Sequence, residues 1–398
     1  MTRAAAGAGA PSDPSAGVEA ALALWRGLAA LPPRPSASPA LERARELAAG
    51  ALARTLRRHQ LSEERFPLTP WEEAGPHALE GPDGAVKGHA FLGSPPTPPE
   101  GSRGRLRPMG EFRVWGYRPW RRWAVWDAAG RRPQAYVAER VDGPAVPQAV
   151  PPGSACLPRL AVGADARPLL ERWHAAGAEV TVRVALARRA PTARGVNLVA
   201  WPPLPPRVVV GAHLDTVPTT SGAYDNAAGV ALLLAVAASL PPALADTTAF
   251  VLFDGEEAGL IGSEAFCAAH AGALATASFV NLDGVGRGEL LEAWIWPEAL
   301  DEVAVAAFED GRPDPLRLEV KFPPPPASDH MAFAARGVPS IMWTVDDQEI
   351  IHTARDTVDP RMEANVRRLV PVVASTVRRL SQAGRGGDAG VPGDPLVP

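Results

Sequence analysis

Continuous apolar runs alternate with helical patterns in the second half of the chain. Between residues 196 and 345 these runs are VNLVAW, RVVVGA, TTAFVLF, ASFVNL and PSIMWTV. Runs that are apolar at nearly every position are typical of strands covered on both faces. Helical patterns separate several of them, namely NAAGVALLLAVAASL, GLIGSEAFCAAH and, at the end, MEANVRRLVPVVASTVRRL. This alternation predicts a three-layer α/β/α domain built on a mostly parallel, mixed sheet.

The pattern before residue 190 is different. An amphipathic helix is predicted after residue 16, and SPALERARELAAGALARTLRRHQ has apolar residues at helical spacing. Residues 72–190 are rich in Pro, Gly and Arg, with alternating runs (EFRVWGY, EVTVRVAL) that predict strands and one predicted helix that ends at Gly177. We therefore expect N-terminal helices at 17–71, a smaller, mainly β inserted module at 72–190, and the α/β domain at 191–382. The Gly-, Pro- and Ala-rich ends, 1–16 and 383–398, are expected to be disordered.

Composition excludes several function classes. The formal net charge is −4, so the chain has no positive excess that would attract nucleic acid or an acidic membrane. The two cysteines, Cys156 and Cys267, cannot form a disulfide framework, and cysteine-based metal chemistry is not expected. No apolar run is long enough to span a bilayer, and the N-terminus lacks the charged-then-apolar order of a signal peptide. We expect a soluble, cytoplasmic protein.

Two further signals receive structural interpretations. The stretch FRVWGYRPWRRWAVW at 112–126 interleaves Trp with Arg, a pattern that can bind single-stranded nucleic acid by stacking. Because the chain has no basic excess, we interpret it as cation–π packing inside a hairpin. The stretch DGVGRG has the spacing GxGxG and no clear helix after it, so it is a weak dinucleotide signal.

Acidic residues and histidines follow one predicted strand after another. They are His213 and Asp215, then Asp254, Glu256 and Glu257, then Asp283, and finally Asp346, Asp347, His352, Asp356 and Asp359. Ligand crevices of open α/β sheets lie at the carboxyl ends of the strands, so ordinary loop chemistry does not explain this distribution. Clustered carboxylates repel one another unless cations neutralise them, and histidines together with carboxylates suit zinc. A site with two metal ions roughly 3.5–4 Å apart would use this many ligands.

Five motifs occur in an order that resembles the M28 family of zinc aminopeptidases. They are HLD at 213–215, GAYDNAAG at 222–229, EEAGLIGS at 256–263, NLD at 281–283 and HTARDTVD at 352–359. SDHMAFAARGVPSI at 328–341 also resembles the family's segment near the substrate pocket. The resemblance covers roughly residues 190–380 and implies the zinc exopeptidase fold. The second half of the 72–190 module resembles the protease-associated lid that many relatives carry.

The resemblance also implies roles for individual residues. Two Zn²⁺ ions would share Asp225. One ion would add His213 and Asp283, and the other would add Glu257 and His352. Glu256 would be the general base, Asp215 would orient His213, and Asp356 would do the same for His352. Tyr224 is bulkier than the family pattern leads us to expect. The implied activity is the removal of N-terminal residues from peptides with a free N-terminus.

Three alternatives stay open. The first is single-zinc acyl transfer, as in glutaminyl cyclases. The second is carboxypeptidase or dipeptidase activity on the same fold, which the ligands do not separate from aminopeptidase activity. The third is a binding protein on an inactive peptidase scaffold. The full ligand set favours the peptidase over the first and the third. His330 receives no role, and Cys267, in a predicted helix, is interpreted as a small core residue.

Overall fold

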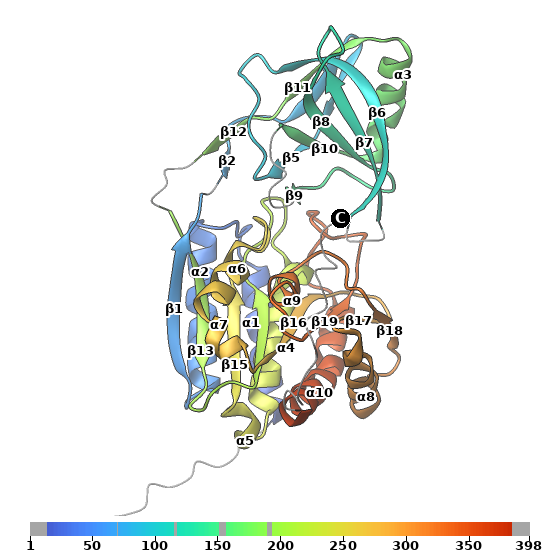
Figure 1. The fold of residues 1–398 in the computed structure, drawn as a ribbon. Helices are drawn as coiled ribbons and strands as arrows, with labels where there is room; N and C mark the ends of the chain where they lie inside the picture. Colours follow the sequence, from blue (N-terminus) through green and yellow to red (C-terminus); the bar gives the residue numbers. More distant parts are fainter. Residues whose placement is uncertain (1–13, 70, 115–117, 151–156, 189–192, 384–398) are drawn as a thin grey trace, which may run out of the picture.

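The computed structural model describes residues 14–69, 71–114, 118–150, 157–188 and 193–383. These residues form an α/β domain and a mainly β module that lies over one end of it (Figure 1). The α/β domain is assembled from two parts of the chain, because strand β1 before the module pairs with strand β13 after it. None of the helices in the described ranges is long and apolar enough to cross a membrane.

The α/β domain is built on a mixed sheet of eight strands. Its central strands, β15, β14, β16 and β19, run parallel to one another. The pairs β1–β13, β13–β15 and β17–β19 are antiparallel, and β18 pairs in parallel with β17. In spatial order the strands are β1 (Gln60–Pro67), β13 (Arg194–Trp201), β15 (Thr248–Phe253), β14 (Val208–His213), β16 (Ser278–Val285), β19 (Ser340–Val345), β17 (Leu290–Trp296) and β18 (Arg317–Lys321).

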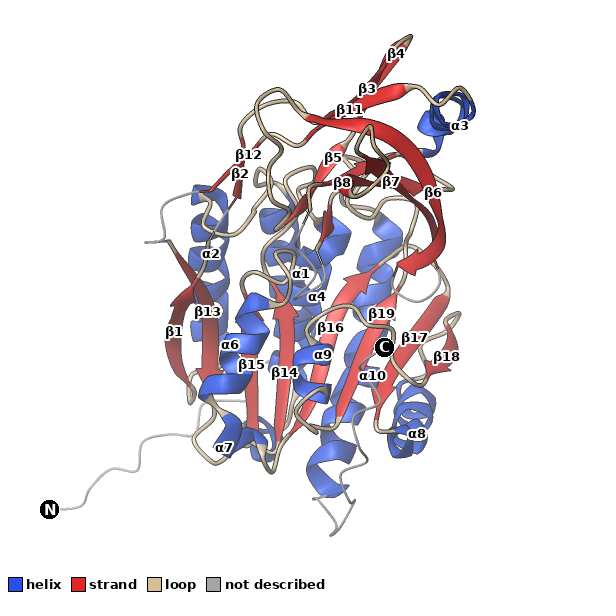
Figure 2. Ribbon diagram, turned by 45° about the horizontal axis from the view of Figure 1, so that its top comes forward, coloured by secondary structure: helices blue, strands red, loops and turns tan. Residues whose placement is uncertain are grey.

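Helices cover both faces of this sheet (Figure 2). Along β14, Val208 and Val210 face one helical layer and Val209 faces the other, which is the period-two alternation of a strand buried on both sides. The first layer contains α1 (Pro14–Ala29), α2 (Pro39–Thr55), α4 (Ala228–Ser239), α5 (Pro242–Ala245), α8 (Asp301–Gly311) and α10 (Pro360–Ala383). The second contains α6 (Ile261–Ala269), α7 (Ala271–Leu274) and α9 (His330–Ala334). The predicted three-layer architecture is confirmed.

The module is built on a nine-stranded sheet that is mainly antiparallel. Its strands, in spatial order, are β4 (Gly84–Lys87), β3 (Ala78–Gly81), β11 (Glu179–Arg183), β6 (Ser102–Val114), β7 (Arg118–Trp126), β8 (Pro133–Arg140), β10 (Arg159–Val162), β5 (His89–Leu92) and β9 (Gln148–Ala149). Helix α3 (Arg167–Ala175) packs on one face through Trp173, and Gly177 ends it at φ +59°. A two-stranded ribbon of β2 (Trp71–Glu73) and β12 (Leu186–Arg188) lies where the chain enters and leaves the module.

Some predictions need correction, and others are confirmed in part. Helix α1 begins at Pro14, so residues 14–16 belong to a helix and not to a disordered tail, because a proline is well tolerated in a first helical turn. The segment 17–71 contains β1 as well as two helices. The predicted hairpin is present in β6 and β7, where the guanidinium of Arg122 lies over the ring of Phe112 at 5.3 Å. Trp115 lies outside the described residues. The glycines of DGVGRG lead into β17 and not into a helix, so no dinucleotide fingerprint forms.

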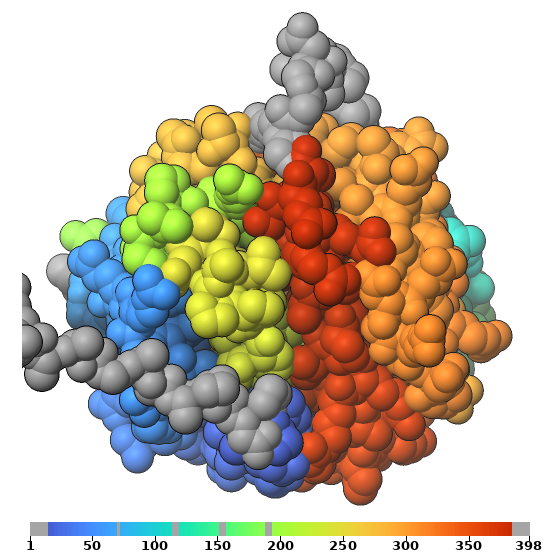
Figure 3. All heavy atoms as spheres, turned by 90° about the horizontal axis from the view of Figure 1, so that it is seen from below, coloured from blue at the N-terminus to red at the C-terminus, as the bar shows by residue number. Residues whose placement is uncertain are grey.

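The module lies over the carboxyl edge of the central strands. Arg140 at the end of β8 is buried and donates a hydrogen bond to the carbonyl of Gln348, which follows β19. The opposite end of the α/β domain is formed by helices and loops, with red α10 between yellow residues near 240 and orange residues near 310 (Figure 3). The module therefore covers the edge at which the acidic residues and histidines gather.

Candidate metal centre

Parallel strands bring the motif residues to one edge of the sheet. His213 is the last residue of β14, Glu256 and Glu257 follow β15, Asp283 lies near the end of β16, and His352 follows β19. Asp225 lies in the segment Ala223–Ala227 that precedes α4, at a kink where its own backbone angles are not helical. Because these central strands run in one direction, their carboxyl ends meet, and the side chains lie within contact distance.

The first group of possible ligands consists of His213, Asp225 and Asp283. His213 Nε2 lies 3.0 Å from Asp225 Oδ1 and 3.1 Å from Asp283 Oδ1. One donor atom from each residue lies within 4.8 Å of the other two. His213 and Asp225 are buried, and Asp283 is half-buried.

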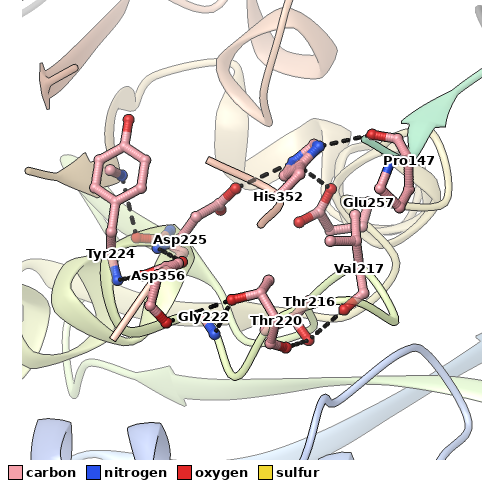
Figure 4. Close-up of polar contacts among 12 residues, drawn as sticks. Pro147, Thr216, Val217, Thr220, Gly222, Tyr224, Asp225, Glu257, His352 and Asp356 are labelled. Carbon is pink, nitrogen blue, oxygen red and sulfur yellow. Dashed lines mark hydrogen bonds and ion pairs between the residues drawn. The ribbon is translucent and has the colours of Figure 1, made fainter. Parts of the chain in front are cut away.

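The second group consists of Asp225, Glu257 and His352. His352 Nε2 lies 3.2 Å from Asp225 Oδ2 and 3.2 Å from Glu257 Oε2 (Figure 4). Asp225 thus uses its two carboxylate oxygens for different groups, Oδ1 toward His213 and Oδ2 toward His352. A carboxylate placed between two such groups has the geometry of a bridging ligand.

The donor set fits zinc. Ligand atoms about 2.0–2.2 Å from a tetrahedral zinc ion lie roughly 3.3–3.6 Å from one another. The nitrogen–oxygen separations of 3.0–3.2 Å are slightly shorter than this range. Glu257 Oε1 is buried and has no hydrogen-bond partner among the described residues. A bound cation would satisfy that oxygen.

Charge attraction within the clusters shifts the pKa values of their members. Burial by itself would lower the pKa of His213, but Asp283 and Glu256 reverse this and raise it well above its usual value. Burial opposes a low pKa for Asp225, yet its contacts with His213 and His352 hold that pKa well below the usual range. Without a metal ion the clusters therefore hold protonated histidines against carboxylates, and a divalent cation would take the place of those protons.

Glu256 differs from its neighbour Glu257. It belongs to neither ligand group, and it is half-buried whereas Glu257 is buried. Burial raises the pKa of Glu256 well above its usual value, and the nearby carboxylates of Glu257, Asp283 and Asp329 raise it further. A carboxyl group with a raised pKa beside a metal centre is suited to accept and return a proton.

Asp215 holds the turn that carries the two glutamates. Its two carboxylate oxygens accept hydrogen bonds from the backbone N–H groups of Glu256 and Glu257, each at 3.2 Å. Toward His213, the nearer partner of Nδ1 is the backbone carbonyl of Asp215 at 3.1 Å, and the carboxylate lies 3.6 Å away. Asp215 is thus a positioning residue for the glutamate pair as well as for His213.

The expected contact between Asp356 and the ring of His352 does not form. Asp356 instead accepts hydrogen bonds from the backbone N–H groups of Tyr224, at 2.6 Å, and Asp225, at 3.2 Å (Figure 4). His352 Nδ1 lies 2.8 Å from the carbonyl oxygen of Pro147, which belongs to the module. Donation from Nδ1 to that carbonyl leaves Nε2 facing Asp225 and Glu257. The bulk of Tyr224 is explained by its hydroxyl, which accepts a hydrogen bond from the backbone N–H of Asp347 at 3.2 Å.

Arg34 is a functional candidate that the sequence pattern did not reveal. It is completely buried and donates hydrogen bonds to the carbonyls of Leu28, Leu214 and Ser221. Burial lowers its pKa to about 10, which leaves it charged at neutral pH. Arg34 therefore ties together the loops that carry Asp215 and Asp225. It comes from the segment between α1 and α2, far from every motif.

The remaining strand-end acids do not enter the metal groups. Asp254 accepts a hydrogen bond from the backbone N–H of Val196, and burial raises its pKa to about 7. Asp347 pairs with Arg287, and Asp359 pairs with Arg361. Asp346 accepts a hydrogen bond from the side chain of Gln348 at the wall of a cavity beside the metal groups.

His330 is a buried neutral histidine. Its Nε2 lies 3.2 Å from the carbonyl of Pro325, and its ring meets the ring of Trp294 edge-on at 5.7 Å. Burial lowers its pKa to about 3. Cys267 is buried in the core between α6 and the sheet, as expected.

Acid should destabilise the fold through His330. The unfolded chain binds a proton near pH 6.5, whereas the folded chain does not bind it until about pH 3. The contribution of His330 is therefore fully present above pH 6.5 and is lost as the pH falls, by about 3 kcal/mol between pH 7 and pH 4. Urea unfolding of zinc-free protein across this range measures the loss. His330→Asn should flatten the curve, and equal slopes for the two proteins would contradict the assignment.

Cavities of different size open from the two ligand groups. A small one of about 60 Å³ is lined by Asp225, Glu257, Asp283 and His352 of these groups, and by Tyr224, Trp294, Met342, Asp346 and Ile351, among others. A larger one of about 430 Å³ extends from Glu256, Glu257 and His352 toward the module.

Comparison with known proteins agrees with this architecture. The model of Peptidase family M28 matches residues 198–377. Aminopeptidase YwaD of Bacillus subtilis is 28% identical over 167 residues, which cover 39% of this chain and 37% of that protein. The vacuolar membrane protease of Yarrowia lipolytica is 39% identical over 87 residues, 20% of this chain and 8% of that protein. The chain thus spans well under two thirds of the length of these curated relatives.

Solved structures extend the similarity to nearly the whole chain. BSAP, a zinc aminopeptidase from Bacillus subtilis, superposes with a TM-score of 0.65 at 19% identity and covers 93% of this chain and 95% of that chain. The fold is the zinc exopeptidase fold, as expected. The two histidine–carboxylate groups at the carboxyl edge of the sheet are two candidate metal sites. The match to the model of Peptidase family M28 lies within this domain, so the α/β domain is similar to that family over residues 198–377.

Proposed function

We propose that this protein is a zinc aminopeptidase that removes N-terminal residues from peptides. The observation that carries the proposal is the carboxylate of Asp225, which presents one oxygen to each of two complete ligand groups. His213, Asp225 and Asp283 would hold one zinc ion, and Asp225, Glu257 and His352 the other. Zinc at this position would polarise the scissile carbonyl and make hydroxide available near neutral pH.

The protein side chains supply the proton transfers and the positioning. Glu256 takes a proton from the attacking water and returns it to the leaving amine, a role that its raised pKa supports. The carboxylate of Asp215 accepts a hydrogen bond from the backbone N–H of Glu256 and so fixes the position of that residue. The cavity beside the two ligand groups is small, about 60 Å³, and the carboxylates at its wall attract a free α-amino group. These features favour cleavage at the first peptide bond.

We also propose that the module is a lid of the protease-associated type. It supplies the carbonyl of Pro147 to His352 and lines the larger cavity next to the clusters. A peptide bound at the metal ions would therefore lie between the α/β domain and the module.

The function is tested with zinc-loaded protein on three substrate sets: aminoacyl-nitroanilides, N-acetylated peptides and N-terminal glutaminyl peptides. We expect close to two zinc ions per chain by elemental analysis, release of nitroaniline, and no activity after chelation. Acetylation of the N-terminus should lower kcat/KM by at least about 100-fold, since a buried carboxylate then faces no cation. Binding of no more than one zinc ion together with cyclisation of glutaminyl peptides would instead support the single-zinc acyltransferase.

A further inference from the structure

The larger cavity joins the clusters to one face of the module sheet. Glu256, Glu257 and His352 line its α/β side. Its module side contains three arginines and three aromatic residues, namely Arg113, Arg122, Arg159, Phe91, Phe112 and Tyr136. A volume of about 430 Å³ lies within the range of sites that bind small ligands.

Strand register places the two central arginines on the same face. Arg122 of β7 is opposite Ala138 of β8, and Arg159 of β10 is opposite Tyr136 of β8. Because Tyr136 and Ala138 are two residues apart, these side chains point to the same side of the sheet. The other side carries the core that packs on α3, including Trp123 and Val137. The arginines thus face the metal clusters and not the core of the module.

Aromatic rings support both guanidinium groups. That of Arg122 lies 5.3 Å from the centre of the Phe112 ring, and that of Arg159 lies 5.7 Å from the centre of the Tyr136 ring. Stacking on a ring restricts a guanidinium group but leaves its N–H edge able to bind a carboxylate through two hydrogen bonds. Both arginines therefore combine packing against a ring with a position in the lining of the cavity.

The larger cavity has carboxylates at the end beside the ligand groups and arginines at the end beside the module. Among the described residues that line it, Glu256 and Glu257 are the only carboxylates, and both belong to the cluster end. The module end is cationic, and arginine pairs favourably with carboxylates in a partly enclosed site.

We propose that these arginines bind a carboxylate on the leaving side of the substrate, within a few residues of the scissile bond. This inference rests on the proposed aminopeptidase function. The small cavity measures only about 60 Å³, and the larger cavity, which shares Glu256, Glu257 and His352 with it, offers the remainder of the peptide a path toward the module. The preferred substrates are then short peptides with a free C-terminus, or peptides with an acidic residue near the N-terminus.

The test compares three tripeptides that begin with the best residue of the nitroanilide panel. One is Xaa-Ala-Ala as the free acid, one is the same peptide as its C-terminal amide, and one is Xaa-Ala-Asp amide. We expect kcat/KM for the free acid to exceed that for the amide by about tenfold to a hundredfold, mainly through KM. Recovery of the rate by Xaa-Ala-Asp amide would show that a side-chain carboxylate is accepted, and no recovery would restrict the site to the C-terminus.

Variants connect the preference to the arginines. Arg122→Gln and Arg159→Gln should each reduce the ratio between acid and amide, and the double variant should bring it close to one. Arg131→Gln is the matched control, because Arg131 is an exposed arginine of the same module that does not line the cavity. Calorimetry with zinc-loaded Glu256→Gln protein measures the same discrimination as binding, without turnover.

The outcomes separate this inference from the proposed function. Equal rates for acid and amide in the wild-type protein, or an unchanged ratio in the double variant, would overturn the inference and leave the aminopeptidase intact. If no peptide is cleaved, the proposed function fails. The calorimetric difference between acid and amide then decides whether the arginines bind a carboxylate.

Discussion

Glu256→Gln is expected to lower kcat by a factor of about 10²–10⁴ while zinc content and KM stay nearly unchanged. The substitution keeps the size and polarity of the side chain but removes the group that accepts the proton. Glu256 belongs to neither ligand group, so the metal ions should stay in place. Steady-state kinetics and elemental analysis on the same preparation provide the measurement.

Glu257→Ala is the matched comparison for this prediction. Glu257 Oε2 lies 3.2 Å from His352 Nε2 within the second ligand group, so its removal should weaken the binding of one zinc ion. Part of the lost activity should return when zinc is added. If Glu256→Gln loses a zinc ion and keeps its rate at saturating metal, the roles of the two glutamates are reversed.

Asp225→Ala is expected to empty both metal positions and to abolish activity. Loss of a residue that only supports a ligand typically costs 10- to 100-fold in metal affinity, and loss of a shared ligand should cost at least about 100-fold at each position. Zinc titration monitored by calorimetry measures both affinities. The double loss is the distinctive result, because Asp283→Ala should weaken one position only.

Asp359→Asn is the control for Asp225→Ala. Asp359 follows the same strand as His352 but pairs with Arg361 outside the clusters, so zinc binding should not change. Near-ultraviolet circular dichroism verifies that each variant is folded. A variant at Asp225 that is folded and still binds one zinc ion tightly would exclude the shared-ligand arrangement.

The sequence by itself determined the layered fold and the residues that gather at one edge. Val208, Val209 and Val210 form an apolar run because both faces of β14 are covered, and that pattern is local and readable. His213 and Asp283 end or follow such runs, so their position at the carboxyl edge follows from the parallel direction of the strands. The pattern did not reveal β1, whose half-exposed residues alternate weakly at the edge of the sheet.

Only the tertiary structure decided how these residues are connected. The partner of His352 is the backbone carbonyl of Pro147, 205 positions away, and a carbonyl is the same in every residue, so no sequence pattern marks it. Arg34 and Asp356 likewise act on backbone groups brought close by the packing of separate segments. The common face of Arg122 and Arg159 depends on the register between β7, β8 and β10. Local periodicity encodes which face of an element is buried, whereas contacts between distant segments depend on how the elements dock, and that docking created this site.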